Sequence, residues 1–303
     1  MKRYRKAGIV ACSNGLPLNA ESEMEQLKTV LQQQGIAAVF SNYIYASDGV
    51  RSGTAKQRAD ALMEFYLDHS IDVIFDVSGG DVANEVLPYL DYDIIKNAIR
   101  STGHPKEFWG YSDLTVLVNG IYEKTGNAGV LYQIRHLDFL RNDKGSTDVD
   151  REIVTLEKLL DAKYHFLRGN RMSGVVVGGN IRCFLKLAGT EYFPDMMGKI
   201  LFLEARSGLE PQMRTYLSQL QQLDVFEKIS GLYLGTFTQW ERENEKLLKQ
   251  KEKCSCNEVM TMEQLVMEYI PTHLPVVKTY DVGHSPHSQA ITIGTEQKLW
   301  QIL

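Results

Sequence analysis

Short apolar runs separated by helical segments organise the first half of the chain. Three short apolar runs predict strands: 8–12, 37–40 and 72–77. Apolar positions at helical spacing predict helices over 21–34 and 54–66, and Gly35 follows the first of them as a typical terminator. A further short helix is expected near 82–87. This alternation predicts an α/β fold with a doubly wound, mostly parallel sheet.

A polar segment in the middle of the chain, Arg141–Asp150, predicts an exposed linker. We therefore expect two domains, 1–145 and 146–303. The second should be a mixed α/β domain, with helices over about 151–160 and 211–223 and strands at 174–177, 199–206 and 231–235. The dense run of charges at 241–253 predicts a solvated helix face.

Ser112 is the first candidate for chemistry. The aromatic run 107–110 predicts a short strand, and helical spacing begins at Leu114, so Ser112 falls at a strand-to-helix junction. Such a turn can lift a serine nucleophile out of a sheet, and the N–H of Asp113 could then help to hold an oxyanion. The alternative is that Ser112 only caps the helix.

Two further segments supply an acid and a base. Glu204 ends an apolar strand, where a lone carboxylate would be costly to bury, so it needs a partner: a histidine, or alternatively Arg206. His284 follows the apolar residues Val276–Val277 and comes directly after Gly283, with His287 as the fallback base. The other histidines are expected on the surface or in loops: His69, His104, His136, His165 and His273. Serine, acid and histidine in this chain order are used by one large group of serine hydrolases.

The Gly79-Gly80 pair follows the strand at 72–77. Paired glycines let backbone N–H groups approach a substrate carbonyl, although they are also common in turns that need positive φ. Ser13, this loop and Ser112 all follow predicted strands, so they should converge at the carboxyl edge of the sheet. Asp81, next to the glycines, is a candidate substrate contact.

Several motifs together resemble the LD-carboxypeptidase family, which includes the microcin C self-immunity (MccF-like) proteins. They occur in matching order between about residues 8 and 294: Leu87–Asp93, Gly110–Thr115, Gly178-Gly179-Asn180, Leu203-Glu204 and Gly283-His284. The resemblance implies a flavodoxin-like N-terminal domain and a homodimer. It also implies a catalytic triad in a cleft between the domains, with Ser112, Glu204 and His284 as its members and an oxyanion donor in the Gly79-Gly80 loop. Many relatives carry Arg before and Tyr after these glycines, where this chain has Ser78 and Asp81, so hydrolysis is expected but substrate preference is open.

Three functions are compatible with these residues. The preferred one is a serine peptidase that removes a terminal D-amino acid from a murein peptide, without a cofactor or metal. A close alternative is an MccF-like hydrolase acting on aminoacyl-nucleotide conjugates, which the segment Asp91–Lys96 favours by resemblance. The third is a non-catalytic small-molecule binding domain, which would not need a histidine in the cleft.

The composition of the chain limits the classes of binding partner that we expect. The chain has 303 residues, a net charge of −5 and a pI near 5.9, which argues against nucleic-acid binding. The apolar run after the basic start stops at Cys12, which is too early for a secretion signal or a membrane span. The first strand is also not followed by the Gly-x-Gly-x-x-Gly turn that binds a dinucleotide. Cys12 and Cys183 should be buried thiols, whereas Cys254 and Cys256 lie in a charged stretch and fall short of a zinc site. We expect a cytoplasmic protein with no membrane partner.

Overall fold

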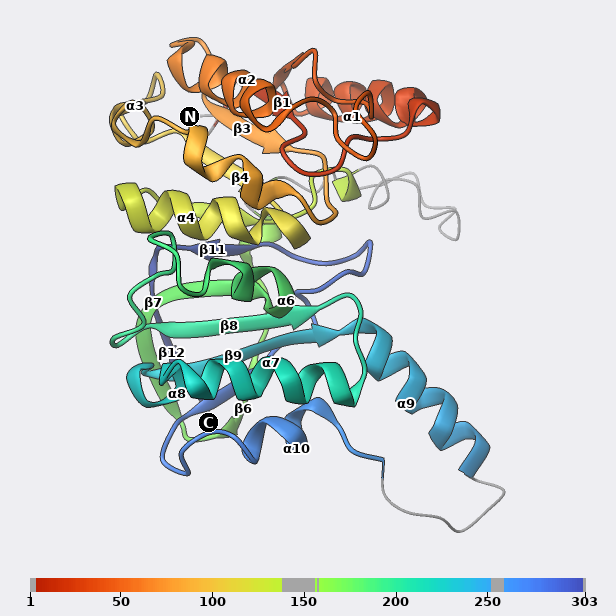
Figure 1. Ribbon diagram of the computed structural model, residues 1–303, viewed down its shortest axis with the longest axis vertical. Coiled ribbons are helices and arrows are strands. Elements are labelled where there is room, and N and C mark those ends of the chain that lie inside the picture. Colours follow the sequence, from red (N-terminus) through yellow and green to blue (C-terminus); the bar gives the residue numbers. More distant parts are fainter. Residues whose placement is uncertain (1–3, 138–155, 157, 252–258, 302–303) are drawn as a thin grey trace.

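The computed structural model describes residues 4–137, 156, 158–251 and 259–301. Within these residues the chain forms two sheets, one above the other along the long axis of the molecule, with helix α4 between them (Figure 1). The boundary expected at 145/146 lies outside the described residues, as does most of the helix expected over 151–160. The described end of that helix, Lys158–Leu160, is a 3-10 turn.

The first sheet has the strand order β11-β5-β4-β3-β1-β2. Its strands are β1 (Lys6–Val10), β2 (Ala37–Phe40), β3 (Val73–Asp76), β4 (Glu107–Gly110), β5 (Gly129–Leu131) and β11 (Ile291–Ile293). All neighbouring pairs are parallel except β11 and β5. The order 2-1-3-4-5 of the first five strands is that of flavodoxin-like folds, so the predicted doubly wound sheet is confirmed.

Helices cover both faces of this sheet because successive residues of a strand point in opposite directions. Ile9 packs into the core beneath α1 (Glu21–Gln33), whereas its neighbour Val10 packs into the core beneath α2 (Ala55–Leu67). Helices α3 (Tyr92–Asn97) and α4 (Thr115–Thr125) lie in the same core as α2. Thr54 caps α2 in a reciprocal capping box with Gln57, which explains where that helix starts.

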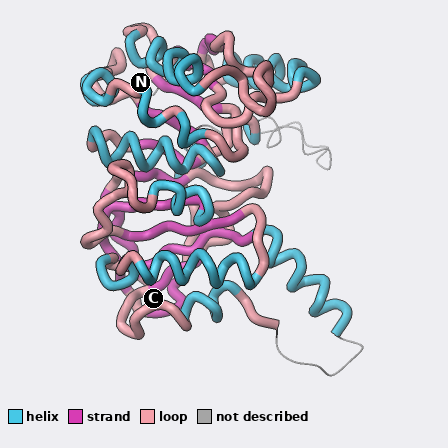
Figure 2. Tube along the Cα trace, in the orientation of Figure 1, coloured by secondary structure: helices cyan, strands magenta, loops and turns pink. Residues whose placement is uncertain are grey.

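The second sheet has the order β12-β7-β8-β9-β10-β6. Its strands are β6 (His165–Arg168), β7 (Arg171–Asn180), β8 (Ile200–Ala205), β9 (Gly231–Phe237), β10 (Val276–Lys278) and β12 (Glu296–Trp300). The four central strands are parallel and the two edge strands antiparallel, so the predicted mixed domain is confirmed. Its helices are α6 (Ile181–Phe184), α7 (Glu210–Gln222), α8 (Val225–Lys228), α9 (Thr238–Lys251) and α10 (Met262–Met267) (Figure 2). No helix in the described part of the chain is long and apolar enough to cross a membrane.

Side chains of helix α4 join the two domains by contacts with the backbone of β7. Asn119 donates to the Gly178 carbonyl oxygen and accepts from its N–H, both at 2.8 Å. A Cβ on Gly179 would lie 2.7 Å from Oγ1 of Thr115, so this glycine lets β7 approach the helix closely. Strand β11 adds a second connection, since the chain returns to the first sheet after it has built most of the second. One of the two hydrophobic cores, the one that contains α2 and α4, therefore runs through both domains, whereas the core beneath α1 belongs mainly to the first.

The helix expected over 82–87 is instead two 3-10 turns, Ala83–Glu85 and Leu87–Tyr89. Pro88 lies at the start of the second turn and has no N–H, so an α-helix cannot continue through it without losing a hydrogen bond. The other predicted helices and strands in the described residues differ from the observed ones mainly at their ends.

Candidate active site

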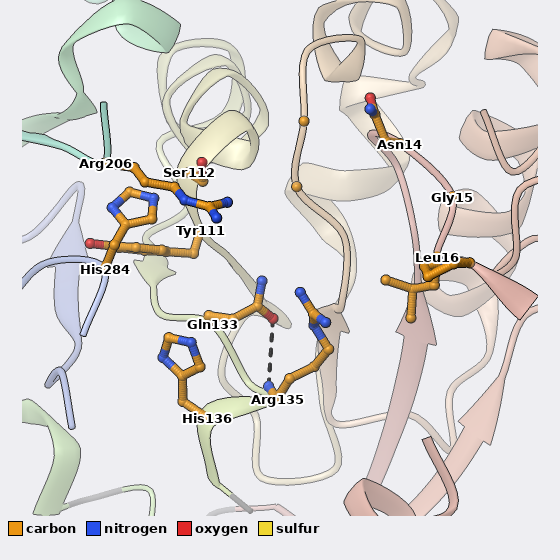
Figure 3. Close-up of a pocket in the computed structure, with 13 residues that line it drawn as sticks. Asn14, Gly15, Leu16, Tyr111, Ser112, Gln133, Arg135, His136, Arg206 and His284 are labelled. Carbon is orange, nitrogen blue, oxygen red and sulfur yellow. Dashed lines mark hydrogen bonds between the residues drawn. The ribbon is translucent and has the colours of Figure 1, made fainter. Parts of the chain in front are cut away.

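A cavity of about 470 Å³ opens at the carboxyl ends of β1, β3, β4 and β5, with His284 and Arg206 of the second domain on its wall. It lies where the strand order reverses between β1 and β3, the usual ligand position in doubly wound sheets. Figure 3 shows Ser112, Tyr111, His284 and Arg206 together on one side of the pocket, with Asn14 to Leu16 on the other. The lining residues are Asn14, Gly15, Leu16, Pro17, Gly79, Gly80, Tyr111, Ser112, Gln133, Arg135, His136, Arg206 and His284.

Ser112 has a φ of +58°, a left-handed conformation that is uncommon for a residue with a side chain. It opens a 3-10 turn, Ser112–Leu114, that leads into α4, and its side chain makes no capping hydrogen bond. Gly110 permits this turn because a Cβ there would lie 2.5 Å from Cβ of Leu114. The geometry is that of a strained strand-turn-helix corner and does not support the alternative role of Ser112 as a helix cap.

The imidazole of His284 contacts the carboxylate of Glu204. Its Nδ1 lies 2.7 Å from Oε2, and the Glu204 side chain is fully buried while His284 is 11% exposed. The other carboxylate oxygen of Glu204 accepts a hydrogen bond of 3.1 Å from Nδ2 of Asn180. Glu204 therefore pairs with a histidine and not with Arg206, which is exposed and lies at the pocket.

Close backbone packing holds the loop that carries His284. Thr236, near the end of β9, donates from its N–H to the Val282 carbonyl oxygen at 2.9 Å. A Cβ on Gly283 would lie 1.7 Å from Oγ1 of Thr236, so only glycine fits before His284. This explains the Gly-His pair in the sequence.

Ser112 and His284 line the same pocket but are not joined by a hydrogen bond. Both ring nitrogens of His284 are buried: Nδ1 lies close to Glu204 without the angles of a hydrogen bond, and Nε2 has no hydrogen-bond partner among the described residues. The ring of Tyr111 lies against the imidazole, with centroids 4.8 Å apart. Burial raises the pKa of the Tyr111 hydroxyl well above its usual value, and the Glu204 carboxylate adds to this. Tyr111 therefore stays neutral beside the pair.

The loop after β3 brings backbone groups to the pocket. Gly80 has a φ of +133°, and a Cβ there would lie 2.2 Å from the Asn14 side chain. Gly79 accepts from the Asn14 N–H at 3.2 Å. Among the described residues, no acceptor is found for the N–H of Gly80. This N–H is therefore available to a ligand.

Asp81 and Asp113 do not line the pocket with their side chains. The Asp81 carboxylate pairs with Arg182, whose hydrogen bond lowers the pKa of Asp81. The Asp113 carboxylate is fully buried beneath the turn. Substrate contact through the Asp81 side chain, as expected from the sequence, therefore lacks support in this geometry. The Asp113 N–H remains at the first turn of a helix, where N–H groups have no partner within the helix.

Several pocket residues were not recognised from the sequence. Gln133, Arg135 and His136 follow β5, and His136, expected on the surface or in a loop, is half-buried in the pocket wall. Burial lowers the pKa of His136 to about 4, and the neighbouring Arg135 acts in the same direction. Their position directly after a parallel strand is the one sequence feature that could have placed them at the pocket. His287 is exposed and lies outside the lining.

Metal binding has no visible basis in the described residues, where no group of three or more His, Cys, Asp or Glu side chains is placed to hold an ion. Cys254 and Cys256 lie outside these residues. Cys12 and Cys183 are buried free thiols, as predicted, and burial raises the pKa of Cys12 well above its usual value.

Fold and pocket together define a two-domain α/β protein with a serine at a strand-to-helix corner. Residues 7–133 match the LD-carboxypeptidase N-terminal domain and residues 173–299 the LD-carboxypeptidase C-terminal domain, so the chain belongs to the LD-carboxypeptidase family of peptidases. Membership makes it a hydrolase by family.

The chain is similar to named relatives of two kinds. The microcin C7 self-immunity protein MccF of Escherichia coli is 26% identical over 95% of this chain and 88% of its own length. A probable murein peptide carboxypeptidase of Bacillus subtilis is 25% identical over 88% of this chain and 80% of its own length.

Solved structures show the same fold. MccF in complex with glutamyl sulfamoyl guanosine matches with a TM-score of 0.78 at 22% identity, over 98% of this chain and 93% of that one. A muramoyltetrapeptide carboxypeptidase from Oxalobacter formigenes matches with a TM-score of 0.72 at 19% identity, over 98% and 95% of the two chains.

Proposed function

We propose that this protein is a serine peptidase in which Ser112 is the nucleophile, His284 the general base and Glu204 the residue that orients the base. The observation that carries this is the 2.7 Å contact of His284 with a fully buried Glu204, next to a pocket that contains a strained serine. A buried carboxylate needs a partner, and an imidazole held through Nδ1 keeps Nε2 for proton transfer.

The reaction is acyl transfer. Ser112 attacks the substrate carbonyl while its proton passes to Nε2 of His284, and the oxyanion accepts hydrogen bonds from the N–H groups of Gly80 and Asp113. His284 then gives the proton to the leaving amine, and water hydrolyses the acyl-enzyme. Ser112 and Nε2 of His284 are not hydrogen-bonded to each other. In this mechanism they come within hydrogen-bond distance in the substrate complex, where such catalytic contacts commonly tighten.

The preferred substrate is a peptide ending in a free carboxylate, cleaved in the manner of an LD-carboxypeptidase acting on murein peptides. Two arginines and two histidines line the pocket, and the lining includes no Asp or Glu among the described residues. Arg135 is partly neutralised by Glu23 at 3.1 Å, whereas no acidic partner is found for Arg206 in the described part of the chain. Such a lining favours an anionic group close to the scissile amide.

Cleavage of an aminoacyl-nucleotide conjugate is the second candidate. It is favoured by the match to MccF over nearly the whole chain, and MccF structures contain glutamyl sulfamoyl guanosine and aspartyl sulfamoyl adenosine. The same Ser112 chemistry would free the amino acid, and the arginines would then face the sulfamoyl or phosphoryl group.

The test is to incubate purified protein separately with a murein tetrapeptide and with an aminoacyl sulfamoyl adenosine, following release of D-alanine and of the free amino acid. Release of D-alanine by the wild type but not by Ser112→Ala supports the preferred function. Turnover of the conjugate alone would establish the second candidate, and equal turnover by Ser112→Ala would remove the serine mechanism from both.

A further inference from the structure

Two cations of the second domain reach across the domain junction to the turns that carry the oxyanion donors. Lys186 lies in the 3-10 turn Leu185–Leu187, and Arg182 lies one helical turn earlier in α6. Lys186 donates both to the carboxylate of Asp113 and, at 2.9 Å, to the carbonyl oxygen of Asp81. Arg182 donates to the carbonyl oxygen of Gly80 at 3.2 Å and pairs with the Asp81 carboxylate.

The Asp113 carboxylate gathers three separate segments beneath Ser112. Besides Lys186, it accepts from the Ser13 hydroxyl at 2.7 Å and from the Ala83 N–H at 2.8 Å. Because this carboxylate is fully buried, its charge requires these donors, and Lys186 is the only cation among the partners described for it. The position of the residue after Ser112 thus depends on the second domain.

The loop with Gly80 is held in the same way. Its carbonyl oxygens at Gly80 and Asp81 accept from Arg182 and Lys186, and the N–H of Asp81 donates to Oδ1 of Asn14 at 3.1 Å. These bonds fix the peptide planes next to the free N–H of Gly80. A donor that is fixed before the reaction needs no reorganisation when the oxyanion forms.

We propose that Lys186 and Arg182 are positioning residues that set the N–H groups of Asp113 and Gly80 for oxyanion binding. This inference rests on the proposed function. Asn180 caps the helix that carries Arg182 and binds Glu204 through its side chain, so the continuous segment 180–186 contacts the triad acid and both donor loops. Domain contact thereby becomes part of the catalytic geometry.

The expected effect falls on the chemical step. Loss of one oxyanion donor lowers kcat by about 100- to 1,000-fold in serine peptidases. A donor that is displaced but still present should lower kcat by a smaller factor. We therefore expect Lys186→Met and Arg182→Gln each to lower kcat by about 10- to 100-fold with KM changed by less than about threefold. Lys186→Arg keeps a cation at Asp113 and should recover most of the loss.

The experiment measures kcat and KM of these variants on the substrate that the wild type cleaves, normalised by the fraction of chains whose Ser112 reacts with a fluorophosphonate probe. Lys124→Met is the matched control, because Lys124 also forms an ion pair across the domain junction, with Glu191, but lies away from the pocket. Arg182 is partly exposed, so its variant should fold even where Lys186→Met does not.

The positioning role would be overturned if Arg182→Gln and Lys186→Met had the wild-type kcat after normalisation, or if Lys124→Met lost as much activity as they do. The proposed function would still stand in that case, provided that the wild type turns over its substrate and its Ser112 reacts with the probe. A rise in KM at constant kcat would also overturn it, since it would place the two cations in substrate binding. If wild-type Ser112 does not react with the probe, it is the proposed function that fails.

Discussion

Ser112 has a backbone conformation that costs on the order of 1–3 kcal/mol for a residue with a side chain. The surrounding contacts hold it there: Gly110 leaves room for Leu114, and the buried carboxylate of Asp113 anchors the next residue. Strain of this kind is common at catalytic corners, because it presents a side chain that regular structure would turn away. The position of the Ser112 hydroxyl therefore lowers the stability of the folded protein.

His136 should make stability depend on pH. Its pKa is about 4 in the folded protein against 6.5 when unperturbed, so the unfolded chain binds the proton more readily between these values. The contribution of neutral His136 to the free energy of unfolding is therefore fully present above about pH 6.5. It is lost as the pH falls toward 4, by up to roughly 3 kcal/mol.

Urea unfolding at pH 7, 5.5 and 4.5 checks this dependence. His136→Gln should lose less stability on acidification than the wild type does, whereas the exposed His104→Gln should follow the wild type. An equal loss in all three proteins would show that His136 does not titrate in this way.

At the scale of elements, the contact of α4 with β7 decides how the domains meet. Asn119→Ala removes both hydrogen bonds to Gly178 and leaves a buried N–H and carbonyl without partners. We expect a loss of about 2–4 kcal/mol in the free energy of unfolding. Asn97→Ala, which removes a bond on the exposed side of α3, should have little effect. Chemical denaturation measures both, and equal stability of the two variants would contradict the role of this contact.

How far the sequence predicts these elements depends on whether the signal is local. The strand before Ser112, the capping box at Thr54 and the αL glycine Gly35 were predictable, because each is determined by neighbouring residues. The pairing of Glu204 with His284 could only be inferred from chain order and family motifs. Its geometry depends on Gly283 fitting against Thr236, a contact between distant segments.

At the scale of the molecule, the pairing of strand β11 is not determined by its local sequence. Ile291–Ile293 is a short apolar run whose sequence does not indicate a pairing partner, and its partner, β5, lies far earlier in the chain. The approach of Arg135 and His136 to a histidine about 150 residues later could not be predicted for the same reason.

The shared core leads us to expect a single unfolding transition. Residues of the first domain such as Leu62 and of the second such as Leu201 belong to one continuous cluster, and the chain passes from the second domain to β11 in the first sheet and back to β12 in the second. Scanning calorimetry should give one peak whose calorimetric and van't Hoff enthalpies agree. Two separable peaks would show that the domains unfold independently.

The central claim is that Ser112 is a nucleophile activated by His284, and covalent labelling tests it most directly. Intact-protein and peptide mass spectrometry after reaction with a fluorophosphonate should find one probe per chain, on Ser112. His284→Ala should react at least about 1,000-fold more slowly and Ser112→Ala not at all, because triad members act as a unit. A wild-type protein that hydrolyses its substrate yet carries no probe on Ser112, or a His284→Ala variant labelled at the wild-type rate, would contradict the account.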